Sequence, residues 1–247
     1  MESEWQESNN MEVIEYVALA RSGHHAIVNW FLKNIIGQEC SFNWQLTIAG
    51  DSGLLHWNDS SVFVEASLEE LKKMKEPNIL SICYDNELYD YSHVNKLNAP
   101  YRKCVFNGWE VTRTRKILII RNFYNNLISR MKMFHDLNEP RAFYDEKYIS
   151  VWKNHARACI EKKVDFIKYE DWLTSKEKRQ ELLSKFGVNE LYDNTNVRGK
   201  QSSFGNSKDF LNRFNPEIVP ENIKELIRKD NELHYLIGKM GYDFVQI

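Results

Sequence analysis

The amino-acid sequence predicts an α/β fold, in which a single parallel β-sheet is flanked by helices on both faces. Short apolar segments alternate with amphipathic segments of helical length, and this order is typical of a parallel sheet. The first apolar segment, Val13–Ala20, indicates a strand buried on both faces, because its apolar residues do not alternate regularly with polar ones. A length of 247 residues with 43% hydrophobic residues fits one domain with a sizeable core.

The N-terminal half is expected to contribute the first strands of this sheet. Residues 1–11 are expected to form a disordered tail before the domain at 12–247. After the first strand we expect a helix over His25–Ile36 that ends at Gly37. The further expectations, in chain order, are a loop over 38–60, a short strand over 61–65, a helix over 68–74 behind a capping box, and a strand over Ile79–Tyr84.

The C-terminal half is expected to add two strands and several helices. Residues 88–114 and 190–215 read as irregular segments. The expected elements are a strand over Lys116–Ile120, helices over Asn125–Leu137 and Tyr144–Lys163, a strand over Val164–Lys168 and a helix that ends near Phe186. One long helix is expected from Pro220 to Gly241, because apolar residues repeat along it at helical spacing.

The composition excludes several classes of protein. The chain has 33 Lys and Arg against 35 Asp and Glu, a net charge of −2, so it has no bulk attraction to nucleic acid. Four cysteines without CxxC spacing favour free thiols over a zinc site or a disulfide framework. The sequence contains neither a signal-peptide pattern nor an apolar run of membrane-spanning length. We therefore expect a soluble, cytoplasmic protein without a membrane or nucleic-acid partner. The sequence does not determine its oligomeric state.

The turn after the first strand is the most informative segment. Arg21-Ser22-Gly23 ends the apolar run, and a helical pattern begins at once with His24-His25. Backbone N–H groups at a helix start lack partners within the helix, and together with the helix dipole they favour an anion. The segment therefore predicts a phosphate or sulfate cradle, with an ordinary strand–helix turn as the alternative.

Polar residues also follow the other predicted strands. Asp85-Asn86-Glu87 follows the strand over Ile79–Tyr84, and Arg121 follows the strand over Lys116–Ile120 with Ser129 eight residues later. Tyr169-Glu170-Asp171 follows the strand over Val164–Lys168. Ligands of parallel sheets bind at the carboxyl ends of the strands. Two arginines at separate strand ends indicate a ligand with two separated negative groups. The first turn lacks the GxxxxGK[ST] pattern, which disfavours an ATPase or a kinase.

These motifs, in this order, resemble those of the sulfotransferase family over roughly residues 13–245. Arg21-Ser22-Gly23 resembles the family's 5′-phosphosulfate loop, and Arg121 with Ser129 resembles its 3′-phosphate motif. The resemblance implies a sulfotransferase or P-loop NTPase-like three-layer sandwich. It also implies 3′-phosphoadenosine-5′-phosphosulfate as the donor, a small-molecule or carbohydrate acceptor with a hydroxyl or amine, and no metal.

The resemblance also implies roles for individual residues. Arg21 would stabilise the bridging oxygen, and Ser22 and Gly23 would hold the phosphosulfate together with His24 and His25, which replace the family's usual hydroxyl pair. Arg121 and Ser129 would bind the 3′-phosphate, and Tyr169 would lie near the adenine. The remaining match is Arg198-Gly199-Lys200, which would close over the 3′-phosphate although its order differs from the usual Arg-Lys-Gly.

The catalytic base is left open by the sequence. Glu87, Asp85 and His93 are candidates because they follow the strand between the two nucleotide motifs, and His56 is a fourth. Glu170 and Asp171 are expected to cap the turn that follows them. Two other functions are compatible with the pattern. One is a catalytically silent nucleotide-binding module of the same fold, and the other, which the missing Walker lysine opposes, is a nucleoside or sugar kinase.

Overall fold

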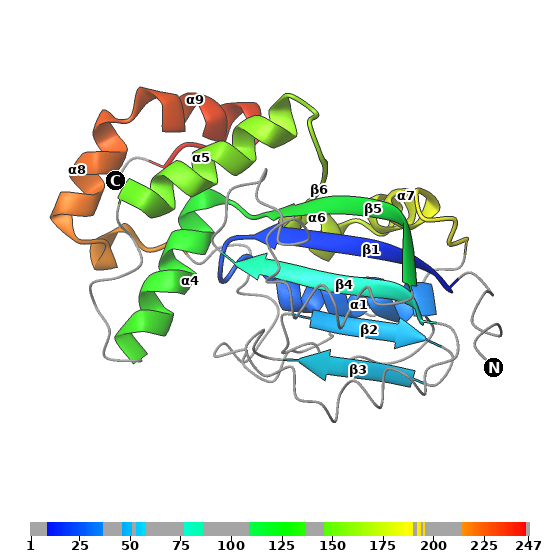
Figure 1. Ribbon diagram of the computed structural model, residues 1–247. Helices are drawn as coiled ribbons and strands as arrows, with labels where there is room; N and C mark the ends of the chain where they lie inside the picture. The colour runs from blue at the N-terminus through cyan, green and yellow to red at the C-terminus, as the bar shows by residue number, and fades with distance from the viewer. Residues whose placement is uncertain are drawn as a thin grey trace, which may run out of the picture.

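A six-stranded β-sheet forms the centre of the protein (Figure 1). The structure is a computed structural model that describes residues 9–36, 46–50, 53–57, 77–85, 109–136, 146–189, 192–193, 195 and 214–245. The strands are β1 (Asn9–Ala18), β2 (Leu46–Gly50), β3 (Gly53–Trp57), β4 (Pro77–Asp85), β5 (Trp109–Ile120) and β6 (Asp165–Lys168). They lie in the order β3-β2-β4-β1-β5-β6.

Four neighbouring strands run parallel, and their carboxyl ends share one edge of the sheet. β1 pairs in parallel with β4 and with β5, and β5 pairs in parallel with β6. In register, Ala18 of β1 lies beside Asp85 of β4, and Ile120 of β5 lies beside Lys168 of β6. The expectation that these strand ends come together is confirmed by this register.

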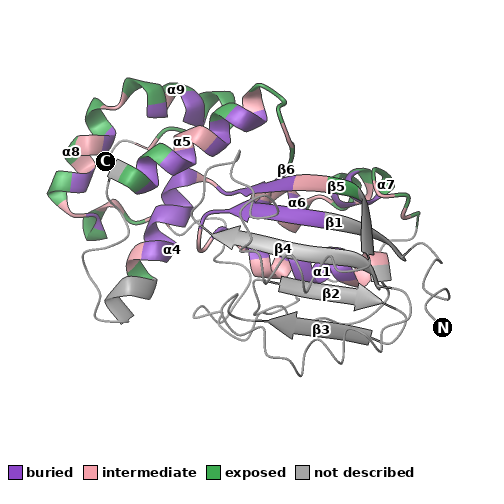
Figure 2. Cartoon of the chain, viewed as in Figure 1, coloured by how far each residue is buried: buried purple, intermediate pink, exposed green. Residues whose placement is uncertain are grey.

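Helices cover both faces of the sheet, so the three-layer α/β architecture is confirmed. Val17 of β1 and Leu19, which follows the strand, pack in one core with α4 (Phe123–Asp136), α5 (Glu146–Ile160), α8 (Glu221–Lys229) and α9 (Asn231–Lys239). Tyr16 and Ala18 pack in a second core with α1 (His24–Ile36), α6 (Tyr169–Thr174) and α7 (Lys176–Ser184). Figure 2 shows the carboxyl half of β1 and the helix faces around it as buried. Successive side chains of a strand point to opposite faces, which is why β1 serves both cores.

Several boundaries differ from the sequence predictions. β1 already begins at Asn9, inside the segment expected to be a tail. β2 and β3 form an antiparallel edge within residues 38–60, where a loop was expected, so the sheet is mixed rather than wholly parallel. β5 is longer than predicted and includes residues 109–114. The strand at 61–65 and the helix at 68–74 lie outside the described residues.

The C-terminal helix is divided into two. α8 ends at Lys229 and α9 begins at Asn231, because Asp230 caps the second helix by accepting a hydrogen bond from Leu233 N–H at 2.9 Å. A 3-10 turn, η2 (Pro216–Ile218), precedes them. None of the described helices combines the length and the apolar character that a membrane span requires. Cys159 is a buried thiol without a disulfide, and burial raises its pKa.

Candidate functional site

The turn that follows β1 has an uncommon backbone conformation. Arg21 has a φ of 69° and Gly23 a φ of 84°, so both lie in the left-handed region. This region costs a residue other than glycine about 1–2 kcal/mol. Ser22 N–H closes the turn by donating to the Leu19 carbonyl at 3.0 Å. Contacts from the rest of the molecule must therefore offset the strain at Arg21.

Side chains from α4 and from the residue that follows β5 supply these contacts by holding the carbonyl groups of the turn. Asn126 Nδ2 donates to the Ala20 carbonyl at 3.2 Å, and Arg130 Nη1 lies 3.5 Å from the same oxygen. Arg121 Nη1 donates to the Arg21 carbonyl at 3.1 Å. The first loop and the predicted 3′-phosphate motif are therefore in direct contact.

Asn126 and Arg130 were missed by the sequence interpretation. Both side chains are buried, at 0% and 3% exposure. A signal was present, because Asn122, Asn126 and Arg130 are four residues apart and such residues share one face of a helix. The same helix carries Ser129, so α4 presents a polar face to the turn.

Arg21 and Ser129, which were assigned to opposite ends of a nucleotide, meet in the structure. Arg21 Nε donates to Ser129 Oγ at 3.4 Å. This distance is long for a hydrogen bond, so the contact is a weak one. The structure thus places Arg21, Arg121 and Ser129 in one cluster at the carboxyl edge of the sheet.

Arg121 is as enclosed as Arg130, with 3% of its surface exposed. Its guanidinium lies 4.7 Å from the centre of the Tyr169 ring, a cation–π distance. Burial lowers the pKa of Arg121, while the charges of Tyr169 and Glu170 raise it. A guanidinium nevertheless stays protonated in proteins. Arg121 therefore brings a permanent positive charge into a desolvated place.

Gly23 and Tyr169 are in close contact. A Cβ added to Gly23 would lie 2.2 Å from Cε2 of Tyr169, which is far inside van der Waals contact. Tyr169 is itself 5% exposed and packs in the core beside α1. Position 23 thus needs glycine both for its positive φ and for the approach of this ring.

His24 is a neutral side chain at the start of α1. It is 2% exposed, and its Nδ1 lies 3.3 Å from Ser22 Oγ. Burial, and then the charge of Arg21, lower the pKa of His24 to about 4. At neutral pH the imidazole can donate or accept a hydrogen bond without carrying charge. The His24 and His25 rings lie 4.1 Å apart.

Glu170 binds elements distant in the sequence, rather than capping its own turn as predicted. Its Oε1 accepts a hydrogen bond from Asn122 N–H at 3.1 Å. Its Oε2 accepts one from the Tyr242 hydroxyl at 2.9 Å. The carboxylate therefore links the end of β5 to the segment that follows α9.

The candidate bases are only partly covered by the described residues. Asp85 is the last residue of β4 and pairs with Ala18, which places its backbone beside the turn. His56 lies in β3, separated from β1 by two strands. Glu87 and His93 lie outside the described residues, as do Arg198, Gly199 and Lys200.

The donor set of this cluster fits an anionic ligand. Three guanidinium groups, those of Arg21, Arg121 and Arg130, gather around a helix start, together with the hydroxyls of Ser22 and Ser129. Arginine can form two parallel hydrogen bonds to one phosphate, and buried donors bind charge more strongly than exposed ones. The arrangement can hold and polarise a phosphate or sulfate group.

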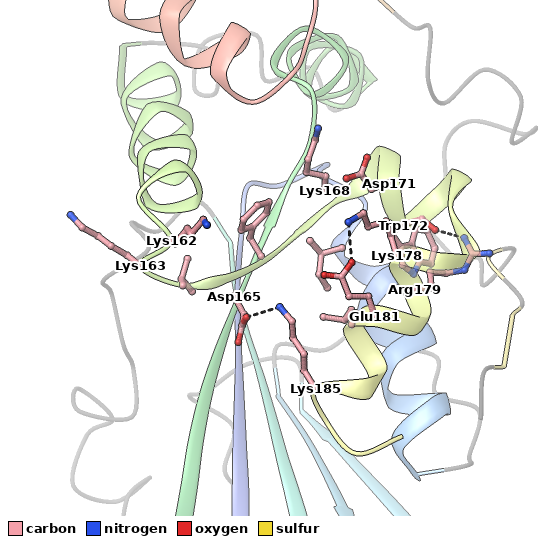
Figure 3. A pocket seen from close by; sticks show the side chains of 14 residues that line it. Lys162, Lys163, Asp165, Lys168, Asp171, Trp172, Lys178, Arg179, Glu181 and Lys185 are labelled. Atoms are coloured by element: carbon pink, nitrogen blue, oxygen red, sulfur yellow. Dashed lines mark hydrogen bonds and ion pairs between the residues drawn. The ribbon is translucent and has the colours of Figure 1, made fainter. Parts of the chain in front are cut away.

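A separate hollow of about 720 Å³ lies beside β6 (Figure 3). It is lined by the segment between α5 and β6, by β6, and by residues of α6 and α7, but not by Arg21, Arg121, Ser129 or Tyr169. Many of its charges are matched locally, since Lys185 pairs with Asp165 at 3.0 Å and Lys178 with Glu181 at 2.9 Å. This hollow is therefore distinct from the candidate site.

Several solved structures match the chain, and sulfotransferase domains are among them. One belongs to the Synechococcus PCC 7002 olefin synthase, with 14% sequence identity, a TM-score of 0.43 and coverage of 97% of this chain and 98% of that one. Another belongs to the curacin biosynthetic pathway, with 11% identity, a TM-score of 0.45 and coverage of 95% and 99%. No family model matches the chain. A search of curated proteins finds no match either.

Proposed function

We propose that the protein is a sulfotransferase that transfers a sulfuryl group from 3′-phosphoadenosine-5′-phosphosulfate to a hydroxyl or amine of an acceptor. The observation that carries the proposal is the cluster of Arg21, Arg121 and Ser129. Two arginines that follow neighbouring parallel strands contact one turn and one helix face. Such a cluster suits a nucleotide with phosphate groups on two positions of its ribose.

Each group of residues has a role in this proposal. Arg121 and Ser129 hold the 3′-phosphate, and phosphate oxygens replace the weak hydrogen bond between Arg21 and Ser129. The adenine lies near Tyr169. The 5′ end is held by Arg21, Ser22, Gly23, His24 and His25, and Arg198, Gly199 and Lys200 close over the 3′-phosphate.

The proposed chemistry is an in-line displacement without a metal. The acceptor oxygen or nitrogen would bond to sulfur while the bond from sulfur to the bridging oxygen breaks, so that adenosine 3′,5′-bisphosphate leaves and charge spreads over the outer sulfuryl oxygens. Arg21 stabilises negative charge on the bridging oxygen, but it cannot act as an acid because its guanidinium stays protonated. His24, being neutral, contributes hydrogen bonding. One of Asp85, Glu87 and His93 removes the proton of the acceptor.

The first prediction is that adenosine 3′,5′-bisphosphate raises the thermal unfolding midpoint more than AMP does at equal concentration. A ligand that binds only the native state stabilises it according to its affinity, and AMP lacks the 3′-phosphate that Arg121 would bind. Arg121→Ala should weaken bisphosphate binding about tenfold to a hundredfold, since a hydrogen bond to a charged group contributes about 1.5–3 kcal/mol. Thermal scanning and calorimetry measure the two effects.

A matched control is Arg115→Ala. Arg115 also lies on β5, but its Nη1 donates to the Lys185 carbonyl at 2.7 Å, away from the carboxyl edge. Its removal should leave nucleotide affinity unchanged. Equal shifts from both nucleotides, or unchanged affinity in folded Arg121→Ala, would contradict the 3′-phosphate assignment. Binding of the bisphosphate without sulfate transfer from the labelled donor to a broad acceptor panel would favour the silent nucleotide-binding module.

A further inference from the structure

The segment after α9 returns to the carboxyl edge of the sheet. The segment turns at Gly241, whose φ is 72°. Lys168 Nζ, at the end of β6, donates to the Met240 carbonyl at 2.8 Å and lies 4.6 Å from the centre of the Tyr242 ring. Figure 3 shows the Lys168 side chain pointing away from Asp165 and its ion pair. The strand end and the C-terminal turn are thus held together by Lys168.

Tyr242 extends this contact to Glu170. The Tyr242 hydroxyl donates to Glu170 Oε2 at 2.9 Å. Burial, followed by the charge of Glu170, raises the pKa of Tyr242 well above its ordinary value. The hydroxyl therefore stays protonated and remains a donor at neutral pH. We call Lys168, Glu170 and Tyr242 the C-terminal clamp.

The clamp acts on the peptide unit that follows Arg121. The carbonyl of Arg121 and the N–H of Asn122 belong to one planar peptide group. Glu170 Oε1 accepts from that N–H at 3.1 Å, and Trp152 Nε1 donates to that carbonyl at 3.0 Å. Both polar atoms of the peptide are therefore fixed from opposite sides. A fixed peptide plane restricts the direction in which the Arg121 side chain leaves the backbone.

We propose that Glu170 and Tyr242 are positioning residues for Arg121, so that the C-terminal segment sets the affinity for the 3′-phosphate. This inference rests on the proposed function, because it assigns Arg121 to that phosphate. The two oxygens of Glu170 are engaged by neutral donors, Asn122 N–H and the Tyr242 hydroxyl. The hydrogen bonds of Glu170 therefore fix the backbone next to Arg121 and the position of Tyr242.

The experiment compares the affinities for adenosine 3′,5′-bisphosphate and for AMP in the full chain by calorimetry. Tyr242→Phe should weaken bisphosphate binding about threefold and Glu170→Ala about tenfold, the range expected for one or two lost hydrogen bonds. AMP affinity should stay within about twofold in both, because AMP does not engage Arg121. Glu170→Gln should restore most of the loss, since its amide oxygen can accept from Asn122 N–H.

The control is Tyr16→Phe, which removes a buried tyrosine hydroxyl on β1 that packs against Phe31, in the core opposite the one that Tyr242 contacts. It should leave both affinities unchanged. If the clamp variants weaken both nucleotides equally, the clamp stabilises the fold without positioning Arg121, and the inference is wrong. The inference is also wrong if folded Tyr242→Phe and folded Glu170→Ala both keep the wild-type ratio of bisphosphate affinity to AMP affinity. A wild type without preference for the bisphosphate contradicts the proposed function itself.

Discussion

His24 shows how one buried side chain makes stability depend on pH. The native pKa is lowered from 6.5 to about 4, first by burial and then by Arg21. Between these values the unfolded chain binds a proton that the native chain does not, so the free energy of unfolding falls as the pH falls from 6.5 to 4. The loss is on the order of 3 kcal/mol, from the size of the shift.

His24→Asn should remove this part of the pH dependence, because asparagine keeps a polar atom near Ser22 Oγ but does not titrate. Urea unfolding at pH 7, 5.5 and 4.5 measures the free energies. The difference between wild type and variant should narrow or reverse as the pH falls. If both proteins lose stability in parallel, His24 is not neutral in the native state.

For single residues, the sequence identified side chains that follow a strand but not the side chains that form hydrogen bonds to the turn. Arg121, Ser129 and Tyr169 were named because motif spacing and strand ends are visible in a linear sequence, and the structure brings Arg121 to both Tyr169 and the first turn. Asn126 was missed because its partner is a main-chain oxygen. Which carbonyl a side chain reaches depends on the turn geometry, and the unusual φ of Arg21 is not encoded by a local pattern.

At the scale of elements, the turn between β1 and α1 depends on Gly23. Gly23→Ala should cost about 1–2 kcal/mol for the left-handed backbone and about 1–3 kcal/mol more for overlap with the Tyr169 ring. Gly187→Ala is a matched control, because Gly187 has a φ of 75° but nothing within 4 Å of an added Cβ. Chemical denaturation measures both free energies of unfolding.

Comparing the two variants separates the cost of the left-handed backbone from the cost of overlap with the Tyr169 ring. Gly187→Ala should lose only the backbone contribution, so Gly23→Ala should be the more destabilised of the two. Equal losses would show that the Tyr169 ring moves aside at little cost. The core around Tyr169 argues against such movement, since the ring packs 5.9 Å from that of Trp172, which is 1% exposed.

The sequence predictions missed elements whose apolar residues do not repeat clearly at strand or helix spacing. β2 and β3 flank Gly50-Asp-Ser-Gly53, which is a hairpin signal between two short apolar runs. The N-terminal part of β5 was missed because it is polar, with Arg113 and Arg115 along it. The division at Asp230 was hidden by an apolar stripe that continues from α8 into α9, although aspartate is a common N-cap.

For the whole molecule, β1 and β5 join the two cores. Leu118 and Ile120 of β5 face one core, and Ile117 and Ile119 face the other. Neither layer of helices can leave the sheet without exposing strands that the other layer also covers. We therefore expect both layers to unfold in one cooperative transition, as small single domains usually do.

Buried tryptophans on opposite faces of the sheet can show whether the two helix layers unfold together. Trp152 lies in the core with α5 and Trp30 in the core with α1, and both are 0% exposed. Fluorotryptophan NMR, with resonances assigned by Trp152→Phe and Trp30→Phe, should give the same urea midpoint for both positions. Two separate midpoints would show that the layers unfold independently and that the chain holds more than one cooperative unit.

The site at the carboxyl edge has a consequence for synthesis of the chain. Arg21 and Ser129 are 108 residues apart, and Glu170 and Tyr242 are 72 apart. During translation the residues of the first loop leave the ribosome long before the residues that brace them, and contacts of such separation form late. A nucleotide that binds this site therefore stabilises the chain fully only after α9 and Tyr242 have left the ribosome.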